Sequence, residues 1–378
     1  MGIRSNPYVF PSKDFKDLSF KRISDNFSGK KEVDFSEIGL ILSQINFPQI
    51  KINSSLKMED QILSFFMHPE IRFGPKGYIK ESEDFFKKRI LYFYKEKKPI
   101  SFTLLGFPFK MPVPLKTNRI LPDMGEVLFL HRLYKIAEFL NKIYPFGVKI
   151  YIFGEGGFAP FVGVLPQEAQ KYFDFLVFLN KKLNFDKILK IYPLSEMEKE
   201  PGFEKFFEEN IKKLELLYKQ KDKDFLKKFK KVFKPIFRIV NSREYSLEVL
   251  MDVYNENLKF NDLSQEAKKI RKELFKKAQK AIFQYFAYLK TRDDLNYLEK
   301  KVPFHIPLTV SPKLNRLGIW PIRKNCWVLP YHGVPIFWEK ENKWDLEYLI
   351  DLRRRNENIT KVFLEGDREK KPFFYIIG

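Results

Sequence analysis

The middle of the chain alternates between short apolar runs and longer amphipathic runs, which predicts strands that alternate with helices. The apolar runs at 100–105, 148–153 and 188–192 have the length of buried strands. The segments 126–143 and 166–183 carry apolar side chains at helical spacing, so each predicts a helix with one buried face. Strands and helices in this order imply parallel strands joined by right-handed crossovers. We therefore predict an α/β fold with a Rossmann-like open, mostly parallel sheet flanked by helices.

The flanking segments add a helical insertion and a β-rich C-terminal part to this fold. Two earlier runs with helical spacing, 58–66 and 83–94, predict helices ahead of the first strand. Residues 202–288 are lysine-rich and predict the helical insertion. Three short apolar runs then predict strands that either extend the sheet or form a small cap: 304–310, 317–322 and 327–338.

The composition is that of a globular protein. With 378 residues, of which 44% are hydrophobic and 17% aromatic, the chain is too apolar to be disordered. It has no run of about 18 uncharged apolar residues, and its first residues lack the apolar core of a signal peptide. The single cysteine, Cys326, excludes an internal disulfide and a cysteine-based metal cluster. We expect a cytoplasmic protein without membrane association.

The net charge of +21 raises the question of a nucleic-acid partner. The excess lysine is spread along the chain and accompanies 41 phenylalanines, a combination typical of AT-rich genomes. The densest block, Lys227–Lys231, is typical of a solvated helix face with one buried aromatic residue. These features argue against nucleic acid, although a basic nucleic-acid-binding protein stays as an alternative. The positive charge would also draw anionic substrates toward a basic cleft.

Charged residues gather in two loops that each follow a predicted strand. Loop 106–121 follows the first strand of the core, and loop 154–160 follows the second. Ligands of open α/β sheets bind at the carboxyl ends of the strands, so both loops are expected to border one site. Charges between a strand and a helix are typical of a site for a phosphorylated or carboxylated small molecule. They are equally typical of a well-capped helix start.

Two lysines of the first loop are candidates for binding an anion. Lys110 follows Phe107-Pro-Phe, where the proline stiffens the backbone. A lysine held on such a turn can pair with a phosphate or carboxylate as a point charge, and a desolvated one can act as a base. Lys116 stands among prolines in the same loop. The alternative for both residues is an exposed surface lysine.

The carboxylates of the two loops also have structural alternatives. Asp123 and Glu126 have the spacing of a capping box at the start of a helix, and the free N–H groups of such a helix start can bind an anion as well. Glu155 lies in a glycine-rich turn, 154–157, that lacks the spacing of a dinucleotide-binding fingerprint. Glu155 is a candidate for binding an amine, and a bare tight turn is the alternative.

His332 is the candidate acid or base. It stands beside Gly333 between two apolar β-like runs, where a histidine serves either in proton transfer or as a hydrogen-bonded structural residue. The other three histidines have no partner at the spacing of metal ligands, so no metal site is predicted. No cofactor is predicted either.

Several short motifs follow one another along residues 58–338: Lys98-Pro-Ile-Ser-Phe-Thr103, Phe107-Pro-Phe-Lys110, Lys116, Pro122-Asp123-x-x-Glu126, Tyr144-Pro-x-Gly147, Val162-Gly-Val164, Tyr172 and Pro330-Tyr-His-Gly-Val334. In order and spacing they resemble the isocyanide synthase family, which includes the pyoverdine/dityrosine biosynthesis proteins. The resemblance implies one α/β catalytic domain. It also implies replacement of the α-amino group of tyrosine, tryptophan or a similar amino acid by an isocyanide, with ribulose 5-phosphate as carbon donor.

The resemblance implies a role for each candidate residue. The amine would attack the sugar ketone to form an imine, and C–C cleavage would leave one carbon on nitrogen. This chemistry needs a cation for the phosphate, a carboxylate for the amine, and groups that transfer protons. The implied catalytic residues are His332, Lys110 and Glu155. The implied substrate-binding residues are Lys116, Asp123 and Glu126, with both lysines facing the anion and the two carboxylates building the site or binding the amine.

The chain departs from the family pattern at three places. Residues 153–160 have no aspartate where the family pattern resembles Ser-Asp-Gly-x-x-Phe-x-Asp, although Glu155 is placed to substitute for one. Residues 307–312 lack the arginine and histidine of a pattern resembling Arg-Leu-Ser-Ile-His-Pro. Tyr331 stands where the family usually has a tryptophan. A changed substrate or a weakened enzyme is therefore one alternative, and a non-catalytic relative that binds a small anionic metabolite is another.

The predicted organisation has three parts. Residues 1–57 form an N-terminal segment that wraps around the core, residues 58–340 form the α/β catalytic domain with 202–290 mainly helical, and residues 341–378 form a C-terminal extension. The predicted partners are small-molecule substrates, an amino acid and a sugar phosphate. The sequence makes no prediction of the oligomeric state.

Overall fold

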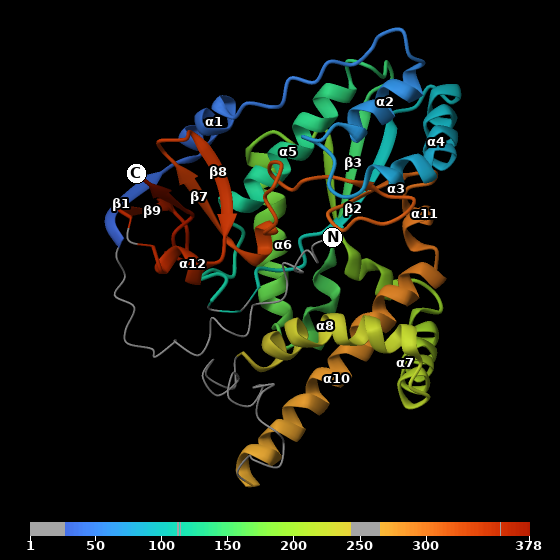
Figure 1. Ribbon diagram of the computed structural model, residues 1–378, viewed down its shortest axis with the longest axis vertical. Coiled ribbons are helices and arrows are strands. Elements are labelled where there is room, and N and C mark those ends of the chain that lie inside the picture. The colour runs from blue at the N-terminus through green and yellow to red at the C-terminus, as the bar shows by residue number, and fades with distance from the viewer. Residues whose placement is uncertain (1–26, 112, 114, 243–264, 356) are drawn as a thin grey trace, which may run out of the picture.

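The computed structural model describes residues 27–111, 113, 115–242, 265–355 and 357–378. Figure 1 shows an α/β part, a second sheet beside it, and a group of helices that projects from one end. The predictions made for residues 1–26 and 243–264 lie outside the described residues. Within the described part, none of the helices is both long enough and apolar enough to cross a membrane.

The α/β part is built on a five-stranded sheet in which every neighbouring pair is parallel. In spatial order its strands are β4 (Leu189–Pro193), β3 (Val148–Gly154), β2 (Ile100–Gly106), β5 (Ile306–Thr309) and β6 (Leu317–Gly318). The three strands predicted from apolar runs are confirmed within two residues at each end. The runs at 304–310 and 317–322 extend this sheet, whereas the third predicted run, 327–338, contributes a strand at 334–338 to the second sheet.

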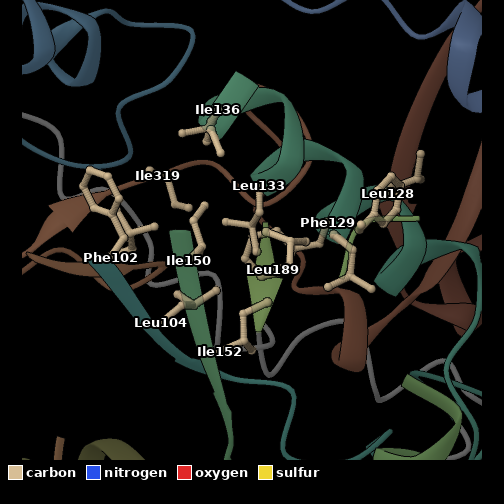
Figure 2. Packing of buried hydrophobic residues seen from close by; sticks show 14 of the residues in the cluster. Phe102, Leu104, Leu128, Phe129, Leu133, Ile136, Ile150, Ile152, Leu189 and Ile319 are labelled. Carbon is tan, nitrogen blue, oxygen red and sulfur yellow. The ribbon is translucent and has the colours of Figure 1, made fainter. Parts of the chain in front are cut away.

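Helices cover both faces of this sheet because its strands are apolar on both sides. On one face lies α5 (Met124–Leu140), whose Leu133 and Ile136 pack over Ile150 and Ile152 of β3 (Figure 2). The same apolar cluster includes residues of α2 (Met58–Met67), α3 (Lys76–Glu81), α4 (Glu83–Lys95) and α6 (Pro166–Lys182). The four helices predicted at 58–66, 83–94, 126–143 and 166–183 are confirmed, with small shifts at their ends.

The other face of the sheet packs against the helical insertion. Tyr151 and Phe153 of β3 contact an apolar cluster that contains Tyr288 and Tyr297. These tyrosines belong to α10 (Gln265–Asp294) and α11 (Tyr297–Lys301). The insertion also contains η2 (Leu194–Lys199), α7 (Phe203–Lys219) and α8 (Lys223–Asn241). In α8, Phe229 is buried while lysines 227, 228, 230 and 231 are exposed, as predicted for a solvated helix face.

The strand order creates a topological switch point between β2 and β5. From β2 the chain builds β3 and β4 on one side, crosses back through the helical insertion, and then adds β5 and β6 on the other side. The loops that leave β2 and β5 at their carboxyl ends therefore diverge. Ligands of doubly wound sheets bind in the crevice at such a point.

A second five-stranded sheet joins the two ends of the chain. Its strands, in spatial order, are β1 (Phe27–Val33), β9 (Ile359–Leu364), β10 (Phe374–Ile377), β7 (Val334–Trp338) and β8 (Lys343–Glu347). It is mixed: β1 runs parallel to β9 and β10 parallel to β7, while the other two pairs are antiparallel. The predicted boundary at residue 340 falls between β7 and β8, which pair with each other.

Candidate functional site

Lys110, in the loop that follows β2, lies at the centre of a buried cluster of charges. Its Nζ atom is 2.7 Å from Asp123 Oδ2 and 2.9 Å from Glu126 Oε2. It also donates a hydrogen bond of 2.8 Å to the carbonyl of Pro330. An ammonium group has three N–H donors, so these partners account for all of them. The side chain is 0% exposed, which closes it to solvent in this conformation.

The predicted capping box at the start of α5 is present and forms part of this cluster. Asp123 Oδ1 accepts a hydrogen bond of 2.8 Å from the backbone N–H of Gly125, and Glu126 Oε2 accepts one of 2.9 Å from the backbone N–H of Asp123. Tyr172 of α6 donates to Glu126 Oε1 at 3.1 Å. Both carboxylates thus cap the helix and pair with Lys110. The capping-box prediction is confirmed, and the substrate-binding role stays a prediction.

Burial sets the ionisation of the cluster. It raises the pKa of Asp123 well above its ordinary value, against the opposing charge of Lys110. It also raises the pKa of Tyr172, and the nearby Glu126 adds to this effect, so the phenol keeps its proton. The two carboxylates are balanced by the Lys110 ammonium and by hydrogen bonds from two backbone N–H groups and the Tyr172 hydroxyl. The side chains of both carboxylates are buried, so the cluster belongs to the interior beside the loop.

His332 and Lys116 lie close enough to this cluster for the charges of Lys116 and Lys110 to act on the imidazole. His332 ends the short helix η4 (Pro330–His332), whose first residue accepts the hydrogen bond from Lys110. Burial, followed by the charges of Lys116 and Lys110, holds the pKa of His332 well below its ordinary value. The imidazole is therefore neutral at physiological pH. A neutral imidazole offers one ring nitrogen as a proton acceptor.

Lys116 differs from Lys110 in having no carboxylate partner among the described residues. Its Nζ lies 5.2 Å from the centre of the Tyr348 ring. Burial lowers its pKa to about 8, and the charge of Arg238 on α8 acts in the same direction. Part of the population therefore carries a neutral amine near physiological pH. Of the two predicted anion-binding lysines, Lys116 is the one whose donors are not taken up by a carboxylate.

The C-terminal sheet fixes the loop that carries Lys116. Arg119 is buried and its Nη1 atom lies 2.7 Å from Asp367 Oδ2 and 2.6 Å from the carbonyl of Lys371. Glu369 accepts hydrogen bonds from the backbone N–H groups of Ile120 and Leu121, at 2.7 and 3.1 Å. A segment near the end of the described chain thus holds the loop in place.

The glycine-rich segment after β3 is a helix, which corrects the prediction of a tight turn. Residues Glu155–Val162 form the 3₁₀ helix η1. A Cβ atom on Gly156 would lie 3.3 Å from the carbonyl of Pro108, and one on Gly157 would overlap the hydroxyl of Tyr288. These glycines therefore allow α10 and the loop after β2 to approach η1. The prediction that they allow close approach of a ligand stays untested.

Glu155 lies among cations that sequence reasoning did not identify. Burial raises the pKa of Glu155, while the charges of Arg292, Arg316 and Lys313 oppose the rise. Arg292 is near the end of α10, and the other two belong to the connection between β5 and β6. For Lys313 and Arg316, the only signal in the sequence was their place between two predicted strands, 304–310 and 317–322. Arg292 lies within a long lysine-rich helix, where nothing distinguishes it from surface residues.

An aromatic path lies between the two groups of charges. Phe109, one residue before Lys110, makes an edge contact with Phe158 of η1, with ring centroids 5.5 Å apart. Phe158 in turn contacts Tyr285 of α10 at 4.9 Å. Burial, followed by the charge of Glu155, raises the pKa of Tyr285 above its ordinary value, so its hydroxyl is protonated at neutral pH. The two groups thus border one region at the carboxyl edge of the sheet.

Comparison with known proteins gives a consistent result. The family model described as pyoverdine/dityrosine biosynthesis protein matches residues 90–352. The L-tryptophan isonitrile synthase AmbI2 from Fischerella ambigua is 24% identical over 262 residues, which cover 67% of this chain and 73% of that relative. The L-tyrosine isonitrile synthase from Xenorhabdus nematophila is 40% identical over 68 residues, 18% of this chain and 20% of that relative.

A solved structure supports the fold. The crystal structure of the PvcA protein from Pseudomonas aeruginosa aligns with a TM-score of 0.63 and 18% identity, and the alignment covers 85% of this chain and 100% of that one. At this identity the likeness concerns the α/β architecture alone.

Proposed function

The chain belongs to the pyoverdine/dityrosine biosynthesis protein family, and from this premise we propose that it is an isocyanide-synthase-like enzyme. Its substrate would be an amino acid of the tyrosine or tryptophan type, and ribulose 5-phosphate would supply the isocyanide carbon. The observation that carries the proposal is the family match over residues 90–352, which includes both loops at the carboxyl edge of the sheet.

The geometry supports a role for Lys110 that differs from the catalytic, anion-binding role expected from the sequence. Because Lys110 is enclosed by Asp123, Glu126 and Pro330, we assign it a positioning role. It holds η4 against the loop, and His332 with it. In this proposal the neutral imidazole of His332 takes a proton from the substrate ammonium, which frees the amine to attack the ketone. Imine formation then releases water.

Lys116 is the residue that this proposal brings to the substrate. Its amino group has no carboxylate partner in the described part of the chain, and burial lowers its pKa to about 8. As an ammonium it would pair with the carboxylate of the amino acid, and as a neutral amine it would exchange protons with an intermediate. Glu155 and the cations around it lie at the other end of the aromatic contacts that run from Phe109 to Tyr285.

The experiment is a direct product assay. Purified protein is incubated with L-tryptophan or L-tyrosine and ribulose 5-phosphate, and the isocyanide is detected by mass spectrometry. We expect product from the unaltered chain and a loss of at least about 100-fold in His332→Gln, since general acid–base catalysis contributes about 10²–10⁴-fold. The exposed Lys181→Met serves as the control and should retain activity.

The absence of product with every amino acid tested, under conditions where the Fischerella ambigua enzyme is active, would count against the proposal. A specific observation favours a second candidate in that case. The charges of the Lys110 cluster are all satisfied internally, as in a structural element, and residues 307–312 lack the arginine and histidine of the family pattern. Stabilisation of the fold by sugar phosphates without turnover would favour a non-catalytic relative that binds an anionic metabolite.

A further inference from the structure

A cavity of about 260 Å³ lies at the switch point of the parallel sheet. It opens between the β2–β5 pair and the helices α10 and α11. The residues that line it include Thr103, Leu105, Arg292, His305, Pro307 and Arg316. Cavities for drug-sized ligands begin at about 300 Å³, so this one suits a smaller group.

Two guanidinium groups line this cavity, and a lysine lies close to both. Arg292 is buried, with 6% exposure, and Arg316 is partly buried. Lys313 lies three residues before Arg316 in the same connection and is exposed. Partial desolvation of its amino group lowers the pKa of Lys313, and the charges of Arg316 and Arg292 lower it further. Three positive charges are therefore gathered at one place.

Asp293, which also lines the cavity, and Glu155 compensate these three cations only in part. Arg292 directs Nε and Nη2 to a single oxygen of Asp293, at 2.9 and 2.7 Å, and Nη1 has no hydrogen bond to any described residue. Neither Lys313 nor Arg316 has a carboxylate within ion-pair distance in the described part of the chain. Glu155 is the one further acidic group whose charge acts on all three, and its own burial raises its pKa. Gathered like charges cost free energy, which a bound anion would recover.

The other acidic residue of the cavity is already engaged. Glu299 lies 3.5 Å from Arg89 Nη2 and 3.4 Å from the ring nitrogen Nδ1 of His305, and it accepts a hydrogen bond of 2.7 Å from the backbone of Phe304. It is therefore held toward α4 and the start of β5. The Arg292 and Arg316 side of the cavity keeps its positive charge.

We propose that Arg292, Arg316 and Lys313 bind the phosphoryl group of a small phosphorylated substrate in the switch-point cavity. A phosphate dianion offers the oxygens that planar guanidinium groups bind in pairs, and Lys313 supplies a third charge at the rim. Glu155 acts as a positioning residue that balances the guanidinium groups while the site is empty. This inference adds a phosphate-binding site to the proposed function, and it rests on that function for the identity of the ligand as a phosphorylated ketose.

The test measures binding apart from turnover. Isothermal titration of the full chain with inorganic phosphate, ribulose 5-phosphate and unphosphorylated ribulose is compared between the unaltered protein, Arg316→Gln and Lys313→Gln. We expect ribulose 5-phosphate to bind about 10- to 100-fold more weakly to Arg316→Gln, because charged hydrogen bonds are the strong ones. Lys313→Gln should weaken binding less, since the lysine is exposed. Arg354→Gln, an exposed arginine of the C-terminal part, should bind like the unaltered protein.

A second readout separates binding from a structural role. Removing one of three crowded charges should leave the melting temperature of the ligand-free protein unchanged or raise it, while it reduces the stabilisation that ribulose 5-phosphate provides. Unchanged affinity for inorganic phosphate and ribulose 5-phosphate in both variants would overturn the inference. So would equal affinity for ribulose and its phosphate in the unaltered protein.

The outcomes also distinguish this inference from the proposed function. If the unaltered protein makes no isocyanide but binds ribulose 5-phosphate through Arg316, the cavity assignment stands and the enzyme proposal falls. If it makes isocyanide and Arg316→Gln leaves the KM for ribulose 5-phosphate unchanged, the enzyme proposal stands and the cavity assignment is wrong.

Discussion

Lys110 shows how a residue's role depends on partners that come from distant parts of the sequence. Its carboxylate partners, Asp123 and Glu126, are local, and their spacing predicted the capping box that the structure contains. The Pro330 carbonyl is 220 residues away along the chain. Because that contact is set by tertiary packing, local sequence patterns gave no sign that all three donors would be occupied. The candidate residues were therefore predictable, and the enclosure of Lys110 was not.

Lys116 illustrates the cost of keeping a charge in a partly buried place. Its pKa in the folded protein is about 8, below the ordinary value of 10.5. The folded state therefore binds this proton less tightly than the unfolded state does. The resulting penalty is complete below about pH 8 and vanishes above about pH 10.5, so it weakens as the pH rises between these values.

Lys116→Met should consequently stabilise the protein while it lowers activity. Methionine has a similar length beside Tyr348 but no charge, so we expect the free energy of unfolding to rise by about 1–2 kcal/mol at about pH 7, with allowance for the lysine's partial exposure. The gain should shrink at about pH 9.5. Urea unfolding at both pH values provides the measurement, with Lys181→Met as control. A variant less stable than the unaltered protein at neutral pH would refute this account.

At the scale of elements, the packing of η1 against α10 depends on Gly157. Tyr288 of α10 donates a hydrogen bond of 3.1 Å to Glu198 of η2 and lies directly over this glycine. Three elements that belong to different parts of the chain thus meet at one backbone position. Glu155 is two residues away, so the placement of η1 also sets the position of that carboxylate.

Gly157→Ala should disturb this contact. The added Cβ would overlap the Tyr288 hydroxyl, and we expect a loss of about 1–3 kcal/mol in the free energy of unfolding from overpacking. Gly39→Ala is the matched control: Gly39 lies in α1 (Phe35–Gln44) with no atom near its Cβ position, and alanine should stabilise that helix by up to about 1 kcal/mol. Thermal unfolding distinguishes the two. Equal effects of the two substitutions would exclude close packing at η1.

The elements of the core were predictable because their signals are local. Helix α5 has an apolar stripe that begins directly after its capping residue Asp123, and β3 is an apolar run with one charged residue, Lys149, between Pro145 and Gly154. In η1 the glycines predicted a turn, because glycine is common in turns. Here the segment is helical, and Gly157 is needed because Tyr288 occupies the space that a side chain would fill. That requirement comes from α10 and leaves no trace in the sequence of η1 itself.

On the scale of the whole molecule, the C-terminal sheet and the α/β part are joined through Arg119. This buried guanidinium pairs with Asp367 and reaches the carbonyl of Lys371, between β9 and β10. The loop that carries Lys116 therefore depends on the far end of the described chain. The sequence did not predict this sheet, because the pairing of β1 with β9 is set by contacts between distant segments.

Arg119→Met should uncouple the two parts. Breaking a buried ion pair costs about 3–5 kcal/mol because it leaves Asp367 without its partner. We expect a lower free energy of unfolding, faster proteolytic cleavage within residues 115–122, and reduced activity through the displacement of Lys116. Arg354→Met, which removes an exposed arginine, should change stability by less than about 0.5 kcal/mol. Unaltered cleavage of the loop in Arg119→Met would show that the C-terminal sheet does not hold it.

The parallel pairing of β1 with β9, in which Val33 lies opposite Leu364, has a consequence during synthesis. A ribosome that adds about 5–20 residues per second needs roughly 15–65 s to make the chain between these two strands. Throughout that interval the nascent β1 has no permanent neighbour, and unpaired strands recruit other polypeptides. This strand carries two adjacent charged residues, Lys30 and Lys31, and lysines on an unpaired strand oppose its pairing with other polypeptides. They therefore limit aggregation of the nascent chain before β9 is made.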